Sequence, residues 1–273
     1  MKKKTLPVGL QLYSVRDFLE KDFRATMEKV KEIGYDYAEL GGLYGETPES
    51  IKKIADDVGI KIISAHIGYD EMLADPDATA DTYKAVGCKF IAIPFLDEKT
   101  RPGAPDFDKV LKNINRIGEI FADKDIILLY HNHDFEFITM PDGEFGLDYM
   151  YSHVPERHLK TQLDVCWVKV AGQDPVEYIR KYTGRSPVVH LKDYKGQKTE
   201  NMYGLLGTDK KAVAGDEFRF QPLGDGVQDI PAILEASINA GAEYVIVEQD
   251  SSLECPSIDA VAKSRRYLKS LGW

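Results

Sequence analysis

The stretch IILLYHNH, residues 126–133, begins as a run of apolar residues and ends in two histidines and an asparagine. Seven further short apolar runs occur along the chain, separated by longer amphipathic stretches. The eight runs cover residues 8–15, 35–42, 61–68, 89–95, 126–133, 160–168, 187–194 and 244–250. Runs that are apolar on both faces are typical of parallel strands covered by helices. Eight strand and helix repeats in one chain predict an α/β fold, the closed (β/α)8 TIM barrel.

The segments between these runs carry helical patterns. In residues 106–122, apolar side chains recur at intervals of three and four, and Asp106 is placed to cap the helix. Residues 22–33 form a second such pattern, which Gly34 is suited to end. Proline stands near the start of three more expected helices, at Pro48, Pro175 and Pro231.

The length of 273 residues suits one large barrel, because such barrels commonly run to about 250 residues as one unit. No stretch has the composition of a linker, so we expect a single domain over residues 1–273. One stretch, at about 196–226, is rich in glycine and charge and is too long for an ordinary connection between a strand and a helix. Because this stretch follows the seventh strand, we expect it to lie over the catalytic face.

Composition excludes several classes of partner. The formal net charge of -10 and the pI near 5.2 argue against binding to nucleic acid, whose phosphates require a basic surface. No apolar stretch approaches the roughly 20 residues of a membrane span. The three cysteines are scattered and odd in number, which favours reduced thiols in a cytoplasmic protein. A mature chain whose signal segment had been removed would fit equally well, and a homo-oligomer is left open.

Four consecutive strands end in residue types that bind metal ions, at the barrel face where active sites lie. These residues are His131 and His133 on the fifth run, Asp164 on the sixth, His190 on the seventh and Glu248 on the eighth. Converging buried carboxylates are strongly unfavourable without compensation, and a divalent cation removes that penalty. Two imidazoles with two carboxylates suit Mn, Co, Zn or Fe(II) and do not exclude Mg.

Each of these residues also has a structural interpretation. A single histidine at a strand end is often a hydrogen-bonded core residue, and a lone Asp164 or Glu248 can pair with a buried lysine such as Lys192. The joint pattern at four neighbouring strand ends favours one divalent metal ion. Whether His131 or His133 is the ligand on the fifth strand is less well defined by the pattern alone.

Further polar and aromatic residues near the strand ends are candidates for contacts with a small carbohydrate substrate. They are Tyr13, Glu39, His66 and Trp167, the last as a face for a pyranose ring. Interior hydrogen bonding or packing is the alternative for each of them. Lys192, beside His190, is suited to hold a carboxylate, phosphate or enediolate oxygen. No glycine-rich phosphate loop is visible, so an unphosphorylated sugar, polyol or keto-sugar fits at least as well as a phosphorylated one.

Four segments resemble the sugar phosphate isomerase/epimerase family, whose members are xylose isomerase-like TIM barrels. They are HNHDFEF (131–137), QLDVCWV (162–168), VVHLKDYKG (188–196) and PLGDGVQDIPAILEASINAGAEYVIVEQD (222–250). The resemblance covers essentially the whole chain and implies a single divalent ion at the ends of strands five to eight. Asp164, His190 and Glu248 match the family's ligands, whereas His131 replaces the glutamate of the usual E-N-H.

A divalent ion bound to a carbonyl and an adjacent hydroxyl lowers the cost of removing the proton between them. We therefore predict a metal-dependent sugar isomerase or epimerase that acts through an enediolate, with Glu248, His133 and Lys192 as catalytic residues. A lyase acting on a keto-inositol or a 3-keto-glycoside is the alternative. His131 favours it, because the epimerases of the family use two metal-bound glutamates. A barrel that binds a carbohydrate without converting it is the third hypothesis.

Overall fold

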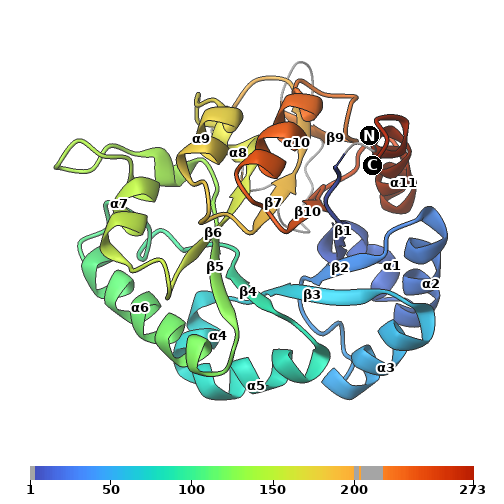
Figure 1. The fold of residues 1–273 in the computed structure, drawn as a ribbon, viewed down its shortest axis with the longest axis horizontal. Coiled ribbons are helices and arrows are strands. Elements are labelled where there is room, and N and C mark those ends of the chain that lie inside the picture. Colours follow the sequence, from blue (N-terminus) through green and yellow to red (C-terminus); the bar gives the residue numbers. More distant parts are fainter. Residues whose placement is uncertain (1–3, 200–202, 204–217) are drawn as a thin grey trace.

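A computed structural model describes residues 4–199, 203 and 218–273 and contains a closed barrel of parallel strands surrounded by helices (Figure 1). The ring consists, in order, of β1 (Val8–Gln11), β2 (Tyr37–Leu40), β3 (Lys61–His66), β4 (Phe90–Ile93), β5 (Ile127–His131), β6 (Lys160–Asp164), β7 (Val188–Leu191) and β10 (Tyr244–Val247). Pairing of β10 with β1 closes the ring. The predicted TIM barrel is confirmed.

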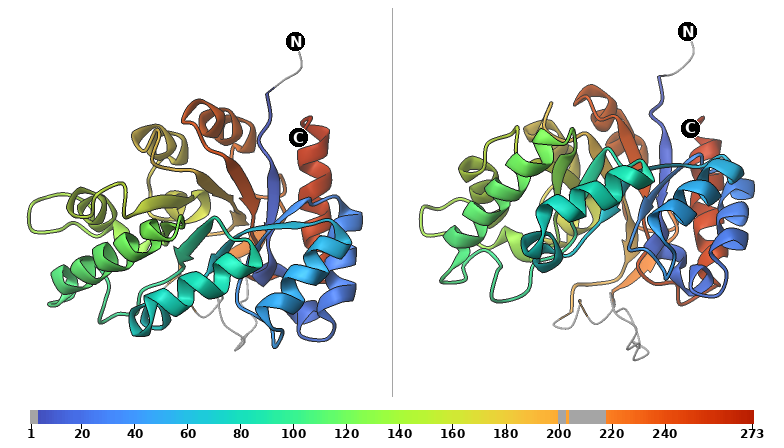
Figure 2. Two further views of the ribbon diagram at one scale, coloured as in Figure 1. Left: turned by 60° about the horizontal axis from the view of Figure 1, so that its bottom comes forward. Right: turned by 90° about the horizontal axis from the view of Figure 1, so that it is seen from below.

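Helices pack around the outside of this ring, as the two further views in Figure 2 show. They are α1 (Arg16–Leu19), α2 (Phe23–Ile33), α3 (Pro48–Val58), α4 (Tyr69–Ala74), α5 (Pro76–Val86), α6 (Phe107–Asp123), α7 (Gly146–His153), α8 (Val165–Val170), α9 (Pro175–Lys181), α10 (Ile230–Asn239) and α11 (Ser257–Ser270). Short 3-10 helices, η1 (Leu12–Val15) and η2 (Phe135–Phe137), follow β1 and β5. Within the described ranges, none of the helices has the length and hydropathy needed to cross a membrane.

The expected helix boundaries are largely confirmed, with one error in capping. α2 ends at Gly34, whose φ of 107° is in the left-handed region that glycine adopts freely. α3, α9 and α10 carry proline in their first turns, as expected. Asp106 precedes α6, but its side chain makes no capping hydrogen bond. Its φ of -98° and ψ of 16° differ from the extended conformation that places a capping side chain over the first turn.

The strands are shorter than the apolar runs that predicted them, and the sixth run changes structure halfway. β6 ends at Asp164, and residues 165–168 already belong to α8. The Oδ1 atom of Asp164 accepts hydrogen bonds from the backbone N–H groups of Cys166 (2.8 Å) and Trp167 (3.1 Å). One carboxylate therefore ends the strand and caps the following helix.

The stretch at about 196–226, which we expected to be irregular, is bounded by regular structure. β8 (Asp193–Lys195) pairs with β9 (Arg219–Gln221) in an antiparallel hairpin. The Asp193 carboxylate accepts backbone hydrogen bonds from Gly224, Gly226 and Gln228, which fix the end of the stretch beside β8. Residues 200–202 and 204–217 lie outside the described residues, so a position over the catalytic face stays a prediction for them.

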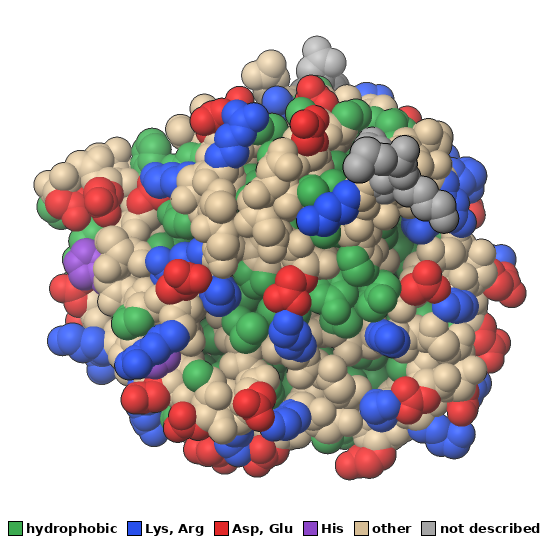
Figure 3. Space-filling model, viewed as in Figure 1, with side chains coloured by type: hydrophobic (Ala, Val, Ile, Leu, Met, Phe, Trp, Pro, Cys, Tyr) green, Lys and Arg blue, Asp and Glu red, His purple; other side chains and the backbone are tan. Residues whose placement is uncertain are grey.

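The barrel interior has an apolar half and a polar half. The apolar half contains Ile63, Phe90, Ala92, Leu129, Val188 and Ile246, with Tyr37, Ile127 and Tyr244 packed at the strand starts. Figure 3 shows this end of the barrel, where hydrophobic side chains gather at the hollowed centre among charged ones. At the opposite, carboxyl ends of the strands, the buried side chains include Gln11, Glu39, His131, Gln162, Asp164 and His190. This polar half is where a site can form.

Candidate active site

A cavity of about 560 Å³ opens at the carboxyl ends of the barrel strands. Its volume lies within the range of about 300 to 1,000 Å³ that small-molecule sites occupy. Of the residues expected from the sequence, Tyr13, His66, His131, His133, Lys192 and Glu248 line it. Asp250 and Tyr203 line it as well, and the sequence analysis had not singled out either residue.

Four ligand-type side chains converge beside this cavity, and two of them, His131 and Glu248, line it. One nitrogen or carboxylate oxygen from each of His131, Asp164, His190 and Glu248 lies within 4.8 Å of the others, and all four residues are buried. The strand register explains the convergence, because Asp164 pairs with His190 across β6 and β7. The four residues predicted as metal ligands therefore occupy one place and are able to hold a single ion.

Asp164 supplies the observation that best tests whether these residues suit a cation. Its Oδ1 atom caps α8, whereas its Oδ2 atom has no hydrogen-bond partner among the described residues. The nearest polar atoms to Oδ2 include Lys192 Nζ at 3.4 Å and His131 Nε2 at 3.7 Å. Burial raises the pKa of Asp164, and Lys192 opposes that shift. A buried carboxylate oxygen without a partner is a group that a metal ion would satisfy.

Lys192 is a buried ammonium beside the cluster. Its Nζ atom lies 2.9 Å from Glu248 Oε2 and 2.7 Å from Asp250 Oδ2. Burial alone would lower the pKa of Lys192, but Asp250 and Glu248 outweigh burial and hold it well above its usual value. Burial would likewise raise the pKa of Glu248, but Lys192 and His190 hold it well below its usual range. Both groups are therefore charged at neutral pH.

The buried carboxyl groups outnumber the buried cations. Glu39, Asp164, Glu248 and Asp250 are all less than 6% exposed, and Lys192, at 1% exposure, forms ion pairs with the last three. Burial raises the pKa of Asp250 to about 6, against the attraction of Lys192. Burial would lower the pKa of His190, but Glu39 and Glu248 outweigh burial and raise it to about 10, so His190 is a second buried cation. A divalent cation within the cluster would add positive charge to this set of four carboxyl groups.

Glu39 lies beneath the cluster and fixes the orientation of His190. Its Oε1 atom is 2.7 Å from His190 Nε2, and its Oε2 atom accepts a hydrogen bond of 2.6 Å from Gln162 Nε2. Because a carboxylate only accepts hydrogen bonds, His190 donates from Nε2, and its Nδ1 atom faces Glu248 Oε2 at 3.0 Å. A carboxylate behind a histidine is the arrangement that orients metal-binding imidazoles.

The position of Glu39 differs from the substrate contact that we predicted. Glu39 is fully buried, and it does not line the cavity. It also lies 3.0 Å from His66 Nε2 and accepts a 2.8 Å hydrogen bond from Gln11 Nε2. Burial would raise the pKa of Glu39, but His66 and His190 outweigh burial and hold it well below its usual range. Glu39 is thus placed as a positioning residue, whereas His66 reaches the cavity wall.

Trp167 does not offer the sugar-binding face expected of it. The helical turn capped by Asp164 places Trp167 in α8, where it is fully buried among Phe218 and Phe220. It is absent from the cavity wall among the described residues. Its ring lies 5.0 Å from that of His133, so Trp167 supports His133 from behind.

His133 is a buried histidine of the cavity wall. Its Nδ1 atom is buried and has no hydrogen-bond partner among the described residues. The ring stacks on Phe135 at 5.5 Å, and the backbone N–H donates to Glu136 Oε2 at 2.8 Å. Burial and the nearby Lys192 ammonium lower the pKa of His133 well below its usual value. A neutral imidazole held in this way is able to accept a proton from a bound molecule.

Several residues of the site were missed in the sequence, although some carried a signal. Gln162 stands two positions before Asp164, and Asp250 stands two positions after Glu248, so alternation along the strands places each pair on one side. Glu136 is fully buried, accepts a hydrogen bond of 2.6 Å from Tyr130, and has its pKa raised to about 8 by burial. Neither periodicity nor spacing identifies Glu136, because it lies in the 3-10 helix η2.

Comparison with known proteins gives consistent results. A family model described as xylose isomerase-like TIM barrel matches residues 27–271. Inosose dehydratase from Clostridium botulinum (strain Alaska E43 / Type E3) is 24% identical over 92% of this chain and 90% of its own. A sugar phosphate isomerase/epimerase structure from Parabacteroides distasonis ATCC 8503 has 23% identity and a TM-score of 0.79, and the match covers 97% of this chain and 98% of that chain. The structure of a xylose isomerase-like TIM barrel protein from Mycobacterium smegmatis, in complex with magnesium, has 16% identity and a TM-score of 0.72. This match covers 98% of this chain and 96% of that chain.

Replacing Glu39 by alanine is expected to destabilise the protein strongly. The change leaves the donors of Gln11, Gln162 and His190 buried without their acceptor. We expect the free energy of unfolding to fall by about 3 to 5 kcal/mol, measured by urea denaturation in the presence of EDTA. Glu49→Ala, at an exposed position of α3, is the matched control and should change the free energy of unfolding by less than about 0.5 kcal/mol. Equal effects of the two variants would contradict the positioning role of Glu39.

Proposed function

The chain belongs to the xylose isomerase-like TIM barrel family, and on that premise we propose that it is a divalent-metal-dependent lyase acting on an uncharged keto-sugar or keto-polyol. The enzyme removes the proton beside a carbonyl group and expels an oxygen from the next carbon. The observation that carries this proposal is the buried cluster of His131, Asp164, His190 and Glu248 at the cavity. The similarity to inosose dehydratase supports elimination as the outcome.

The metal ligands in this proposal are His131 Nε2, Asp164 Oδ2, His190 Nδ1 and Glu248 Oε2. This donor set suits Mn, Co, Zn or Fe(II) and also accommodates Mg. The bound ion would polarise the substrate carbonyl and stabilise the negative charge that follows removal of the neighbouring proton. Glu39 keeps the His190 ring in place by accepting from Nε2.

His133 and Lys192 divide the proton transfers in this proposal. His133 accepts the proton from carbon, because its ring lines the cavity and burial keeps the imidazole neutral. The electron pair of that C–H bond forms the new carbon–carbon double bond, and the bond from the next carbon to its oxygen breaks. The departing oxygen takes a proton, and Lys192 is the only lysine or arginine in the described cavity wall.

The charges of the cavity wall favour an uncharged substrate. Glu71, Glu248 and Asp250 line the cavity, whereas Lys192 is already paired with two of these three carboxyl groups. A phosphate group would meet this excess of negative charge without a free cation among the described wall residues. A keto-sugar or keto-polyol without phosphate is therefore the substrate class that the wall supports.

Isomerisation or epimerisation, the first hypothesis from the sequence, is the second candidate. Both Glu248 and His133 line the cavity, so two groups are available to move protons on and off carbon. Epimerisation through two metal-bound carboxylates is less well supported, because His131 stands where the family's glutamate is expected. The two reactions share the proton removal and differ in what happens to the resulting anion.

The purified protein is expected to contain about one equivalent of divalent metal per chain, measured by mass spectrometry. His190→Ala and Glu248→Ala should lose the metal, because each removes a donor from the cluster. His153→Ala is the matched control, since this histidine is exposed on α7. A metal-free wild type whose melting temperature does not rise on addition of Mn, Co, Zn, Fe or Mg would contradict the metal site.

The reaction itself is tested with a keto-inositol and with methyl 3-keto-glucoside, in deuterated water. We expect a product that absorbs as an enone, because loss of the β-oxygen leaves a double bond conjugated with the carbonyl. Deuterium in recovered substrate or isomer without that absorbance would instead support isomerisation or epimerisation. Neither signal from the metal-loaded protein with any keto-sugar tested would favour a barrel that only binds carbohydrate.

His133→Gln is expected to lower kcat by about 10² to 10⁴, because it removes the group that accepts the proton. Metal content should stay at the wild-type level, since His133 is outside the four-residue cluster. His153→Gln serves as the control and should keep the wild-type kcat. Retention of kcat within about threefold in His133→Gln would assign the proton transfer to another residue.

A further inference from the structure

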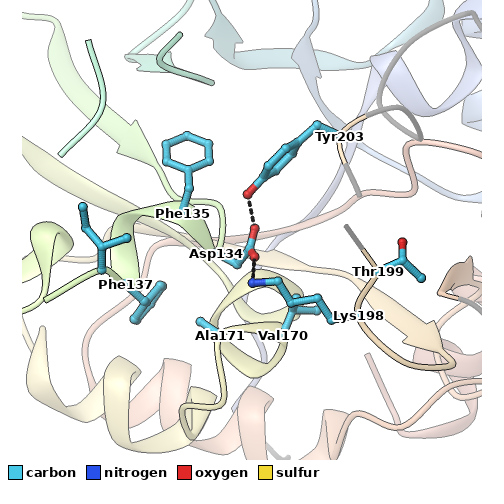
Figure 4. Close-up of a pocket in the computed structure, with 9 residues that line it drawn as sticks. Asp134, Phe135, Phe137, Val170, Ala171, Lys198, Thr199 and Tyr203 are labelled. Carbon is cyan, nitrogen blue, oxygen red and sulfur yellow. Dashed lines mark hydrogen bonds and ion pairs between the residues drawn. The ribbon is translucent and has the colours of Figure 1, made fainter. Parts of the chain in front are cut away.

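A second cavity of about 340 Å³ lies beside the first and has no role in the reaction described above. Its walls are Asp134, Phe135, Phe137, Ile138, Val170, Ala171, Lys198, Thr199 and Tyr203 (Figure 4). These residues belong to the connections that follow β5, β6 and β7. The same three strands supply His131, Asp164 and His190, so the second cavity adjoins the cluster on that side of the barrel.

One side chain, Tyr203, lines both cavities. Its ring lies 6.0 Å from that of His133 and 5.6 Å from that of Phe135, and its hydroxyl donates a hydrogen bond to Asp134. Asp134 directly follows His133 in the chain. Tyr203 therefore lies at the boundary between the two cavities.

The described wall residues of the second cavity form an apolar side and a polar edge, and the polar edge consists of Asp134, Lys198, Thr199 and Tyr203. Phe137, Ile138 and Val170 are apolar, and Ile138 is 41% exposed, which is unusual for a large aliphatic side chain. The polar edge is built around Asp134, which is 6% exposed and forms an ion pair with Lys198. Figure 4 shows Asp134 between the Tyr203 hydroxyl and the Lys198 ammonium.

We propose that this second cavity binds an aromatic leaving group, so that the substrate is the 3-keto form of an aryl glycoside. The inference rests on the proposed function and deepens it. A second sugar unit carries hydroxyl groups around its whole ring, and those facing the buried Phe137 ring would lose hydrogen bonds to water without gaining a partner from that side chain. An aromatic ring buries its faces and edges there at no such cost, and a phenolic or ether oxygen on it meets the polar edge.

The reaction of such a substrate balances within the mechanism already given. The proton leaves C2, beside the C3 carbonyl, and the C1–O bond breaks as the C1–C2 double bond forms. The aryl oxygen takes up a proton and departs as a phenol, leaving an unsaturated keto-sugar. No oxidant or reductant is consumed in this step.

The test compares kcat/KM for phenyl and methyl 3-keto-glucosides. We expect Ala171→Phe, which fills the second cavity, to lower the phenyl-to-methyl ratio by about tenfold or more. Phenol is the better leaving group in every variant, so its effect cancels when the phenyl-to-methyl ratio of a variant is compared with that of the wild type. Lys169→Phe adds the same ring to α8 but lines a different cavity, and it should keep the wild-type ratio. Ile138→Asp, at an exposed position, should also lower the ratio and replaces Ala171→Phe if that variant does not fold.

The outcomes separate this inference from the function on which it rests. A wild type that converts neither glycoside overturns the proposed function itself. A wild type that converts both, with a ratio unchanged in Ala171→Phe and Ile138→Asp, overturns the second cavity as a leaving-group site. If 3-keto-cellobiose loses as much kcat/KM as the phenyl substrate in these variants, the occupant is a sugar and the aromatic assignment is wrong.

Discussion

Burial of carboxyl groups at the mouth of the barrel is the constraint on which the rest of the site depends. Glu39, Asp164 and Glu248 come from different strands and are almost completely removed from water. Each carboxylate is compensated differently. Glu39 is held by amide and imidazole donors, Glu248 by Lys192 and His190, and Asp164 by backbone N–H groups on Oδ1 and by the Lys192 ammonium 3.4 Å from Oδ2. Oδ2 of Asp164 accepts no hydrogen bond from a described residue, so a bound cation would complete its surroundings.

The division of the barrel interior makes this concentration of charge tolerable. The apolar half at the strand starts supplies a packed core, and the polar half is confined to the strand ends. Each polar side chain sits on a strand whose register is fixed by two neighbours, as His131 opposite Gln162 and Asp164 opposite His190 illustrate. A closed ring of strands holds these side chains in nearly fixed positions. A metal site or a proton-transfer site requires such fixed positions.

Periodicity was sufficient to predict the barrel and the residues of the cluster, but not the roles of their neighbours. Apolar runs and the residues that end them lie next to each other in the sequence, so Asp164 and His190 could be identified directly, whereas the choice between His131 and His133 stayed open. Trp167 could not be placed, because a single hydrogen-bonding carboxylate at Asp164 decides whether the following residues continue a strand or begin a helix. Glu39 was expected to face the substrate, since nothing in its own strand shows that Gln11 and Gln162 enclose it. The β8–β9 hairpin depends on pairing across an intervening stretch, which local pattern does not reveal.

The resemblance to the family leads us to expect a glutamate where this chain has His131, and this difference bears on the chemistry that the cluster favours. A neutral imidazole in that position would remove one negative charge from the surroundings of a bound ion, and Lys192 adds a positive charge 2.9 Å from Glu248. Both features make the site more favourable for an anion that forms on the substrate and for an oxygen that departs from it. They are less suited to a reaction that needs two metal-bound carboxylates on opposite faces of the sugar. Elimination requires proton removal from one carbon and protonation of one oxygen, and in the proposed reaction His133 and Lys192, which both line the cavity, would provide these two steps.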